Sequence, residues 1–115
     1  MMAHPNGKTM NSIGFSKYGK PAQLKKTEVP YPHGFDASKN VVIKVHASSV
    51  NPVDKILLSG DLKVVWPVAK FPHVICYDVA GIVEEADNEG VCSVGQPVFA
   101  RIWSKVSDGK KTPWF

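Results

Sequence analysis

Two short segments hold the residues whose types could do chemistry: Asn-Pro-Val-Asp at 51–54 and Cys-Tyr-Asp at 76–78. They offer a carboxamide, a phenol, a thiol and carboxylates, all of which can hydrogen bond to a ligand. Nucleophilic chemistry at Cys76 would need a nearby His or a helix N-terminus to lower the thiol pKa. His73, three residues earlier on a strand-like run, is expected on the opposite face, so Cys76 is interpreted as a packing residue. No His-x-x-His or similar spacing occurs, so no metal site is predicted.

Each of these polar residues also has a purely structural interpretation. Asn51 could be a helix N-cap, and this role can coexist with a chemical one. Asp54 would complement the positive end of the helix dipole. Tyr77 could be a buried aromatic residue whose hydroxyl finds a backbone partner, and Asp78 could pair with a Lys or cap a turn. Both interpretations stay open at this point.

The elements on either side of 51–54 are the clearest in the chain. Residues 40–50 are rich in β-branched side chains and predict a strand, with one face formed by Val41, Ile43, Val45 and Ala47. Asn51-Pro52 combines a favoured N-cap with a favoured first helical residue, and Gly60 is a favoured C-terminal stop. The sequence therefore predicts a short helix over 52–59.

The other apolar runs are short and end at Gly or Pro turns. Strands are predicted at 12–15, 24–29, 74–84 and 98–103. Gly81 inside one of them indicates a bulge or a close backbone approach. Many short strands with one or two short helices predict a mainly β fold, a partly open barrel. We expect residues 1–11 to be a disordered lead-in, 12–103 to form the domain and 104–115 to be a divergent tail.

Composition narrows the function classes. The 115 residues carry a net charge of +4, and all 14 basic residues except Arg101 are Lys, spread along the chain. Nucleic-acid sites favour clustered Arg with interleaved aromatic residues, so no nucleic-acid partner is predicted. No apolar run could span a membrane, and no signal sequence is evident. With only two cysteines, Cys76 and Cys92, a reducing cytoplasmic location is expected.

Several motifs occur together in one order. A Tyr-Gly-x-Pro turn at 18–21 is followed by I-x-V-x-A-S-x-V-N-P-V-D at 43–54, F-P-x-V-x-x-x-D-V-A-G-I-V at 71–83 and V-G-x-x-V-F at 94–99. Jointly they resemble the N-terminal domain of medium-chain dehydrogenases/reductases, on the zinc-free, quinone-oxidoreductase-like branch. The resemblance implies a GroES-like barrel and hydride transfer from NADP or NAD to a quinone, an enone or an activated carbonyl.

The resemblance also implies roles for individual residues. Asn51 stands where the zinc enzymes of the superfamily have a catalytic Cys, and Tyr77 where they have a His ligand. Amide and phenol are poor zinc ligands, so no zinc is expected. Asn51 and Tyr77 are then the candidate catalytic residues, with Asn51, Pro52 and Val53 on the nicotinamide side. Asp54 and Tyr77 would border the pocket of a small-molecule substrate.

The chain also departs from the family pattern. Ile56 stands where many quinone reductases have a Tyr, Cys76 replaces a Gly, and Gln96 replaces an Asp. No G-x-G-x-x-G occurs, so the Rossmann domain that would bind the cofactor is expected to be missing from this chain, which alone would be inactive. A homodimer is expected for a full-length form. The alternative is a truncated, non-catalytic barrel that serves as a binding or interaction module.

Overall fold

The computed structural model describes residues 4–33, 40–68, 70–86 and 92–102. In chain order the elements are β1 (Thr9–Phe15), the 3-10 turn η1 (Pro21–Gln23), β2 (Lys25–Pro30), β3 (Val42–Ser49), α1 (Pro52–Ser59), β4 (His73–Val74), β5 (Asp78–Glu85) and β6 (Pro97–Arg101). The prediction of a mainly β fold with short helices is confirmed. The strands form two open three-stranded sheets that do not close into a complete barrel.

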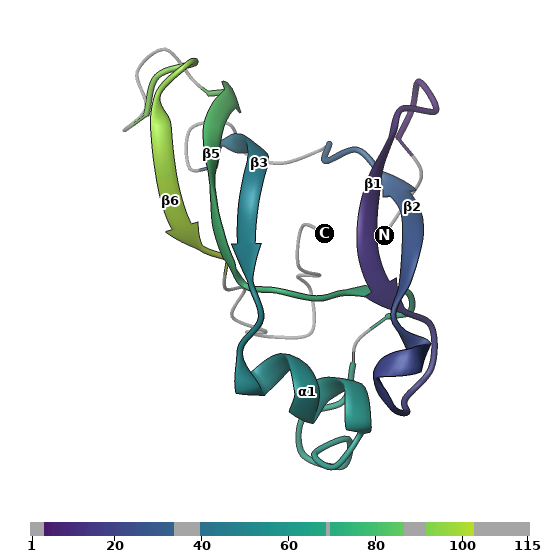
Figure 1. The fold of residues 1–115 in the computed structure, drawn as a ribbon. Coiled ribbons are helices and arrows are strands. Elements are labelled where there is room, and N and C mark those ends of the chain that lie inside the picture. Colours follow the sequence, from purple (N-terminus) through teal and green to yellow (C-terminus); the bar gives the residue numbers. More distant parts are fainter. Residues whose placement is uncertain (1–3, 34–39, 69, 87–91, 103–115) are drawn as a thin grey trace.

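The two sheets stand side by side, with α1 beneath them (Figure 1). One sheet has the order β2-β1-β4 and the other β3-β5-β6, and all pairings are antiparallel. At the end opposite α1, the hydroxyl of Tyr31 lies 2.9 Å from Glu84 Oε2 and 2.7 Å from Glu85 Oε2. This contact joins the segment after β2 to the end of β5.

The hydrophobic core lies where α1 meets the ends of the strands. Phe15, Leu57, Leu58 and Tyr77 form its buried centre, and Tyr18, Leu24, Val53, Val68 and Ile75 pack around them. Burial of these large apolar side chains is the main stabilising contribution to the domain. The core therefore includes Val53 and Tyr77, which belong to the segments 51–54 and 76–78.

The predicted face of the strand before α1 is wrong. Val42, which was not part of the predicted apolar face, is 7% exposed, whereas Val45, which was, is 50% exposed. Two register shifts against β5, at Val42/Ile43 and at Val45/Ala47, interrupt the alternation. Because each shift moves the following side chains to the other face, one continuous apolar face cannot form.

Gly81 of β5 confirms the predicted close approach. A Cβ atom there would collide with the backbone carbonyl oxygen of Lys44 on β3. Only a residue without a side chain lets the two strands approach at the bulge.

Two expected boundaries also differ. β1 begins at Thr9, so residues 9–11 of the expected lead-in belong to a strand that pairs with β2. The strand predicted over 74–84 is interrupted between β4 and β5, because Cys76 adopts a left-handed conformation with φ of 75°. The expected tail at 104–115 lies outside the described residues, as do residues 1–3.

Candidate functional site

The N-terminus of α1 places Asn51 and Asp54 as the sequence predicts. Asn51 is the N-cap residue with extended backbone, Pro52 follows it, and Gly60 ends the helix with φ of 77°. The backbone N–H of Asn51 donates to Asp54 Oδ2 at 2.8 Å, and the N–H of Asp54 donates to the backbone oxygen of Asn51 at 3.0 Å. This reciprocal cap satisfies donors that the first helical turn would otherwise leave unpaired.

Asp54 does more than the expected dipole interaction. Its side chain is only 4% exposed, and its second oxygen, Oδ1, accepts the backbone N–H of Cys76 at 2.8 Å. A buried carboxylate is stable only where hydrogen bonds replace its lost hydration. Asp54 thus ties the start of α1 to the turn that precedes β5, and both segments of the candidate site are held together by it.

Asp78, at the start of β5, holds the side chain of Asn51. Asn51 Nδ2 donates to Asp78 Oδ2 at 2.7 Å, and Ser49 Oγ lies 3.4 Å from the same oxygen. The hydroxyl of Ser48 donates to the backbone oxygen of Asp78 at 2.9 Å. The sequence suggested a Lys or a turn as the partner of Asp78. The structure supplies the Asn51 carboxamide, which no local pattern indicated because the two residues come from different elements.

Tyr77 points into the core, where it is 8% exposed. Its hydroxyl lies 3.3 Å from Nε2 of His73. Burial raises the pKa of Tyr77, and the Asp54 carboxylate adds to the effect, so the hydroxyl stays protonated at neutral pH.

His73, the partner of the Tyr77 hydroxyl, is itself partly buried. Burial lowers the pKa of His73, although the charge of Asp54 opposes the effect. Its ring also lies 5.3 Å from that of Phe15. The sequence contained one indication of the His73–Tyr77 contact, because side chains four residues apart on an extended chain lie on the same face. That indication was not sufficient, because the backbone turns at Cys76 between the two residues and the sequence did not reveal this turn.

The predicted site residues therefore fall into two groups. Asn51 and Asp54 meet Asp78 and Cys76 in one hydrogen-bonded cluster, whereas Tyr77 is held next to it by the core and by His73. Pro52 is exposed beside Asn51, and Val53 packs against the core. Burial also raises the pKa of the Cys76 thiol, which agrees with its interpretation as a packing residue.

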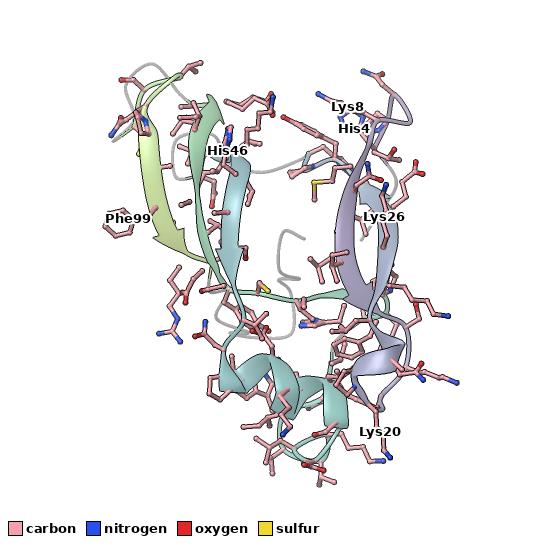
Figure 2. The ribbon with its side chains drawn as sticks, viewed as in Figure 1. His4, Lys8, Lys20, Lys26, His46 and Phe99 are labelled. Carbon is pink, nitrogen blue, oxygen red and sulfur yellow. The ribbon has the colours of Figure 1, made fainter. Side chains whose placement is uncertain are left out.

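A groove of about 530 Å³ lies on the sheet beside this cluster. The strand register places Ala47, Ala80 and Phe99 in one row and Ser49, Asp78 and Arg101 in another. All six line the groove. Phe99 is 89% exposed and projects away from β6 in Figure 2. The groove thus offers an apolar floor with polar groups at the end that Asn51 contacts.

The part of the chain that the structure describes contains no group of three or more His, Cys, Asp or Glu side chains that could hold a metal ion. Within the same residues, no helix has the length and apolar character needed to cross a membrane.

Comparison with known proteins gives a consistent result. Residues 37–112 match the alcohol dehydrogenase GroES-like domain. The chain is 38% identical over 80 residues to a chloroplast envelope quinone oxidoreductase homolog of Arabidopsis thaliana, covering 69% of this chain and 23% of that protein. It is 36% identical over 106 residues to a quinone oxidoreductase of Mus musculus, covering 89% of this chain and 29% of that protein.

A solved structure agrees with these matches. The quinone oxidoreductase from Coxiella burnetii superposes with a TM-score of 0.66 at 30% identity, covering 82% of this chain and 30% of that one. The chain thus spans less than a third of the length of each of these relatives.

Proposed function

The chain belongs to the medium-chain dehydrogenase/reductase superfamily, on the quinone-oxidoreductase-like branch, and on that premise we propose a function for it. It is the N-terminal substrate domain of a zinc-independent, NAD(P)H-dependent oxidoreductase. The acceptors are quinones, enones or activated carbonyls, which are reduced by hydride transfer. Because these acceptors are already electron-poor, orientation and hydrogen bonding can replace a metal.

The observation that carries this proposal is the way Asn51 is held. Its backbone is anchored by Asp54 and one of its two Nδ2 protons is engaged by Asp78. The second Nδ2 proton can donate to an acceptor oxygen that gains negative charge during the reaction. A donor already fixed in place stabilises such an oxygen without any cost of reorganisation.

The remaining predicted residues complete the proposed site. A reduced nicotinamide, when bound, supplies the hydride, and Asn51 with the exposed Pro52 and neighbouring Val53 would lie against its ring. These groups fit a planar ring that carries an amide, because they offer hydrogen bonding next to an apolar surface. Asp54, which holds the backbone of Asn51, and Tyr77, whose hydroxyl is kept protonated, would border the substrate pocket. The rest of the cofactor needs a dinucleotide-binding domain.

The test measures NADPH oxidation by benzoquinone and by cyclohexenone. The chain is fused to the dinucleotide-binding part of the mouse quinone oxidoreductase. We expect Asn51→Ala to lower the rate constant of reduction by about 100-fold, as for loss of one oxyanion donor. Asn11→Ala, at an exposed position of β1, is the matched control and should have no effect. No oxidation above background with either acceptor would contradict the proposal.

A non-catalytic interaction module is the second candidate, and one observation favours it. Phe99 is largely exposed on the sheet face that carries the groove, in one row with Ala47 and Ala80. Exposed apolar groups that cluster on one face mark contact sites.

A homodimer of the full-length form and a cytoplasmic location are also part of our proposal, the latter supported by the free thiols of Cys76 and Cys92.

A further inference from the structure

Asp78 occupies a central position in the cluster around Asn51. It begins β5, the middle strand of its sheet, with Ser49 of β3 opposite it on one side and Arg101 of β6 on the other. Its backbone oxygen accepts the Ser48 hydroxyl, so the strand end itself is held. The Asp78 side chain is thus carried by a rigid element, while Asn51 lies on the adjoining helix terminus.

The chemistry of a carboxylate decides the orientation of its partner. An ionised Asp can only accept hydrogen bonds, whereas a carboxamide has a donor end and an acceptor end that are nearly equal in shape. At 2.7 Å from Asp78 Oδ2, only the Nδ2 end of Asn51 is tolerated. The flipped carboxamide would place two acceptor oxygens against each other. Asp78 therefore selects one of the two amide orientations.

The backbone of Asn51 is fixed independently of its side chain. Asp54 holds the backbone N–H at 2.8 Å, and the helix that follows sets the backbone conformation. The hydrogen bond from Asn51 Nδ2 to Asp78 Oδ2 restricts the torsion that turns the carboxamide plane. Asp54 thus fixes the backbone of Asn51, and Asp78 fixes the orientation of its carboxamide.

We infer that Asp78 is a positioning residue, which orients the Asn51 carboxamide so that its second Nδ2 proton is presented to the carbonyl oxygen of an acceptor. This inference rests on the proposed function for the identity of the acceptor. It assigns to Asp78 a role that no sequence pattern indicated. The carboxylate acts through Asn51 and does not itself touch the acceptor.

The first experiment needs no ligand. In the 115-residue chain, the two side-chain amide protons of Asn51 are observed by NMR with ¹⁵N labelling. We expect one of them to be shifted strongly downfield by the charged acceptor, and Asp78→Asn, whose neutral amide oxygen is a weaker acceptor, to reduce that shift. Asp61→Asn, at an exposed position after α1, is the matched control and should leave both resonances unchanged.

The second experiment uses cyclohexenone labelled with ¹³C at its carbonyl as the probe. A hydrogen bond from Asn51 should move the carbonyl resonance downfield as the chain is added, and Asn51→Ala should abolish the movement. We expect Asp78→Asn to weaken the affinity for the probe by about fivefold, the effect of about 1 kcal/mol. Asp61→Asn, at an exposed position outside the groove, should change the affinity less than about twofold.

The outcomes separate the two proposals. If the probe binds the parent chain and Asp78→Asn equally well, the positioning role is wrong and the proposed function stands. If the probe binds neither, the proposed acceptor is wrong, and the inference that depends on it falls too. If Asp78→Asn leaves the Asn51 amide resonances unchanged, the orientation itself is wrong whatever the probe does. Unfolding in urea checks that each variant is folded.

Discussion

The carboxylate of Asp54 accepts the backbone N–H of Cys76 at 2.8 Å, across 22 positions of sequence. This one bond joins the start of α1 to the turn that leads into β5. It brings the two segments singled out in the sequence into a single cluster, because Asp54 also holds the backbone of Asn51. Asp54 is therefore the residue on which the geometry of the site depends most.

Replacing Asp54 by Ala should strongly destabilise the fold. Two backbone N–H groups, on Asn51 and Cys76, would lose the buried carboxylate that accepts them. We expect a loss of about 2–4 kcal/mol in the free energy of unfolding, measured in urea. Asp61→Ala is the exposed control and should cost less than about 0.5 kcal/mol. Equal effects of the two variants would show that the buried carboxylate does not hold these segments.

Cys76 should tolerate glycine better than a branched residue. Its φ of 75° lies in the left-handed region, which costs an ordinary residue about 1–2 kcal/mol and Gly almost nothing. Cys76→Gly should be at least as stable as the parent in thermal unfolding, whereas Cys76→Val should be less stable by about 2 kcal/mol. A large loss of stability in Cys76→Gly would mean that the thiol contributes more than packing.

Adding one methyl group at Gly81 should disrupt the bulge between β3 and β5. The new Cβ would meet the backbone oxygen of Lys44, which cannot move without shifting the strand. We expect Gly81→Ala to cost about 3 kcal/mol or more in urea unfolding. Gly19→Ala is the control, because its Cβ would meet the Gln23 side chain, which can rotate away. Equal losses of unfolding free energy in the two variants would contradict the prediction.

Stability should depend on pH through His73. Burial lowers the pKa of His73 below its ordinary value of 6.5, so the folded state binds fewer protons there than the unfolded chain. The stability that neutral His73 contributes is present above pH 6.5 and is lost as pH falls below it towards the folded pKa. The groups around it are the Tyr77 hydroxyl, the Phe15 ring and the charge of Asp54.

His73→Phe isolates this pH effect, since it keeps an aromatic ring beside Phe15 and removes the titrating group. Urea unfolding of the parent and the variant is compared between pH 7.5 and pH 5, an interval of about one to two units on either side of the ordinary His pKa. We expect the slope of stability against pH to be smaller in the variant. Parallel curves for the two proteins would mean that His73 does not titrate with folding.

The exposed face of β3-β5-β6 should promote self-association. Phe99 is 89% exposed and lies on the face that carries the groove. Phe99→Ser should raise the monomer fraction in sedimentation velocity runs at high protein concentration, because it removes the largest apolar side chain there. Val64→Ser, in the segment after α1 and 90% exposed, is the control and should leave the distribution unchanged. The same result for both variants would argue against a specific contact on this face.

Features decided within a few residues could be predicted from the sequence. Helix α1 begins after Asn51 and ends before Gly60 as predicted, because capping and a left-handed stop are local interactions. The close approach at Gly81 was also predictable, since a glycine weakens a strand and is favoured there mainly where another backbone comes near. The motifs that carry the family resemblance are local in the same sense.

The arrangement of the site needed the tertiary structure. The Asn51–Asp78 and Asp54–Cys76 bonds join residues 27 and 22 positions apart, and the His73–Tyr77 contact depends on a backbone turn between them. Likewise, the burial of Val42 and the exposure of Val45 follow from two register shifts. A sequence determines which groups can hydrogen bond and where a helix can begin. Which of those groups come into contact depends on strand register and on left-handed turns. These features are stabilised only by contacts that form when the whole chain packs.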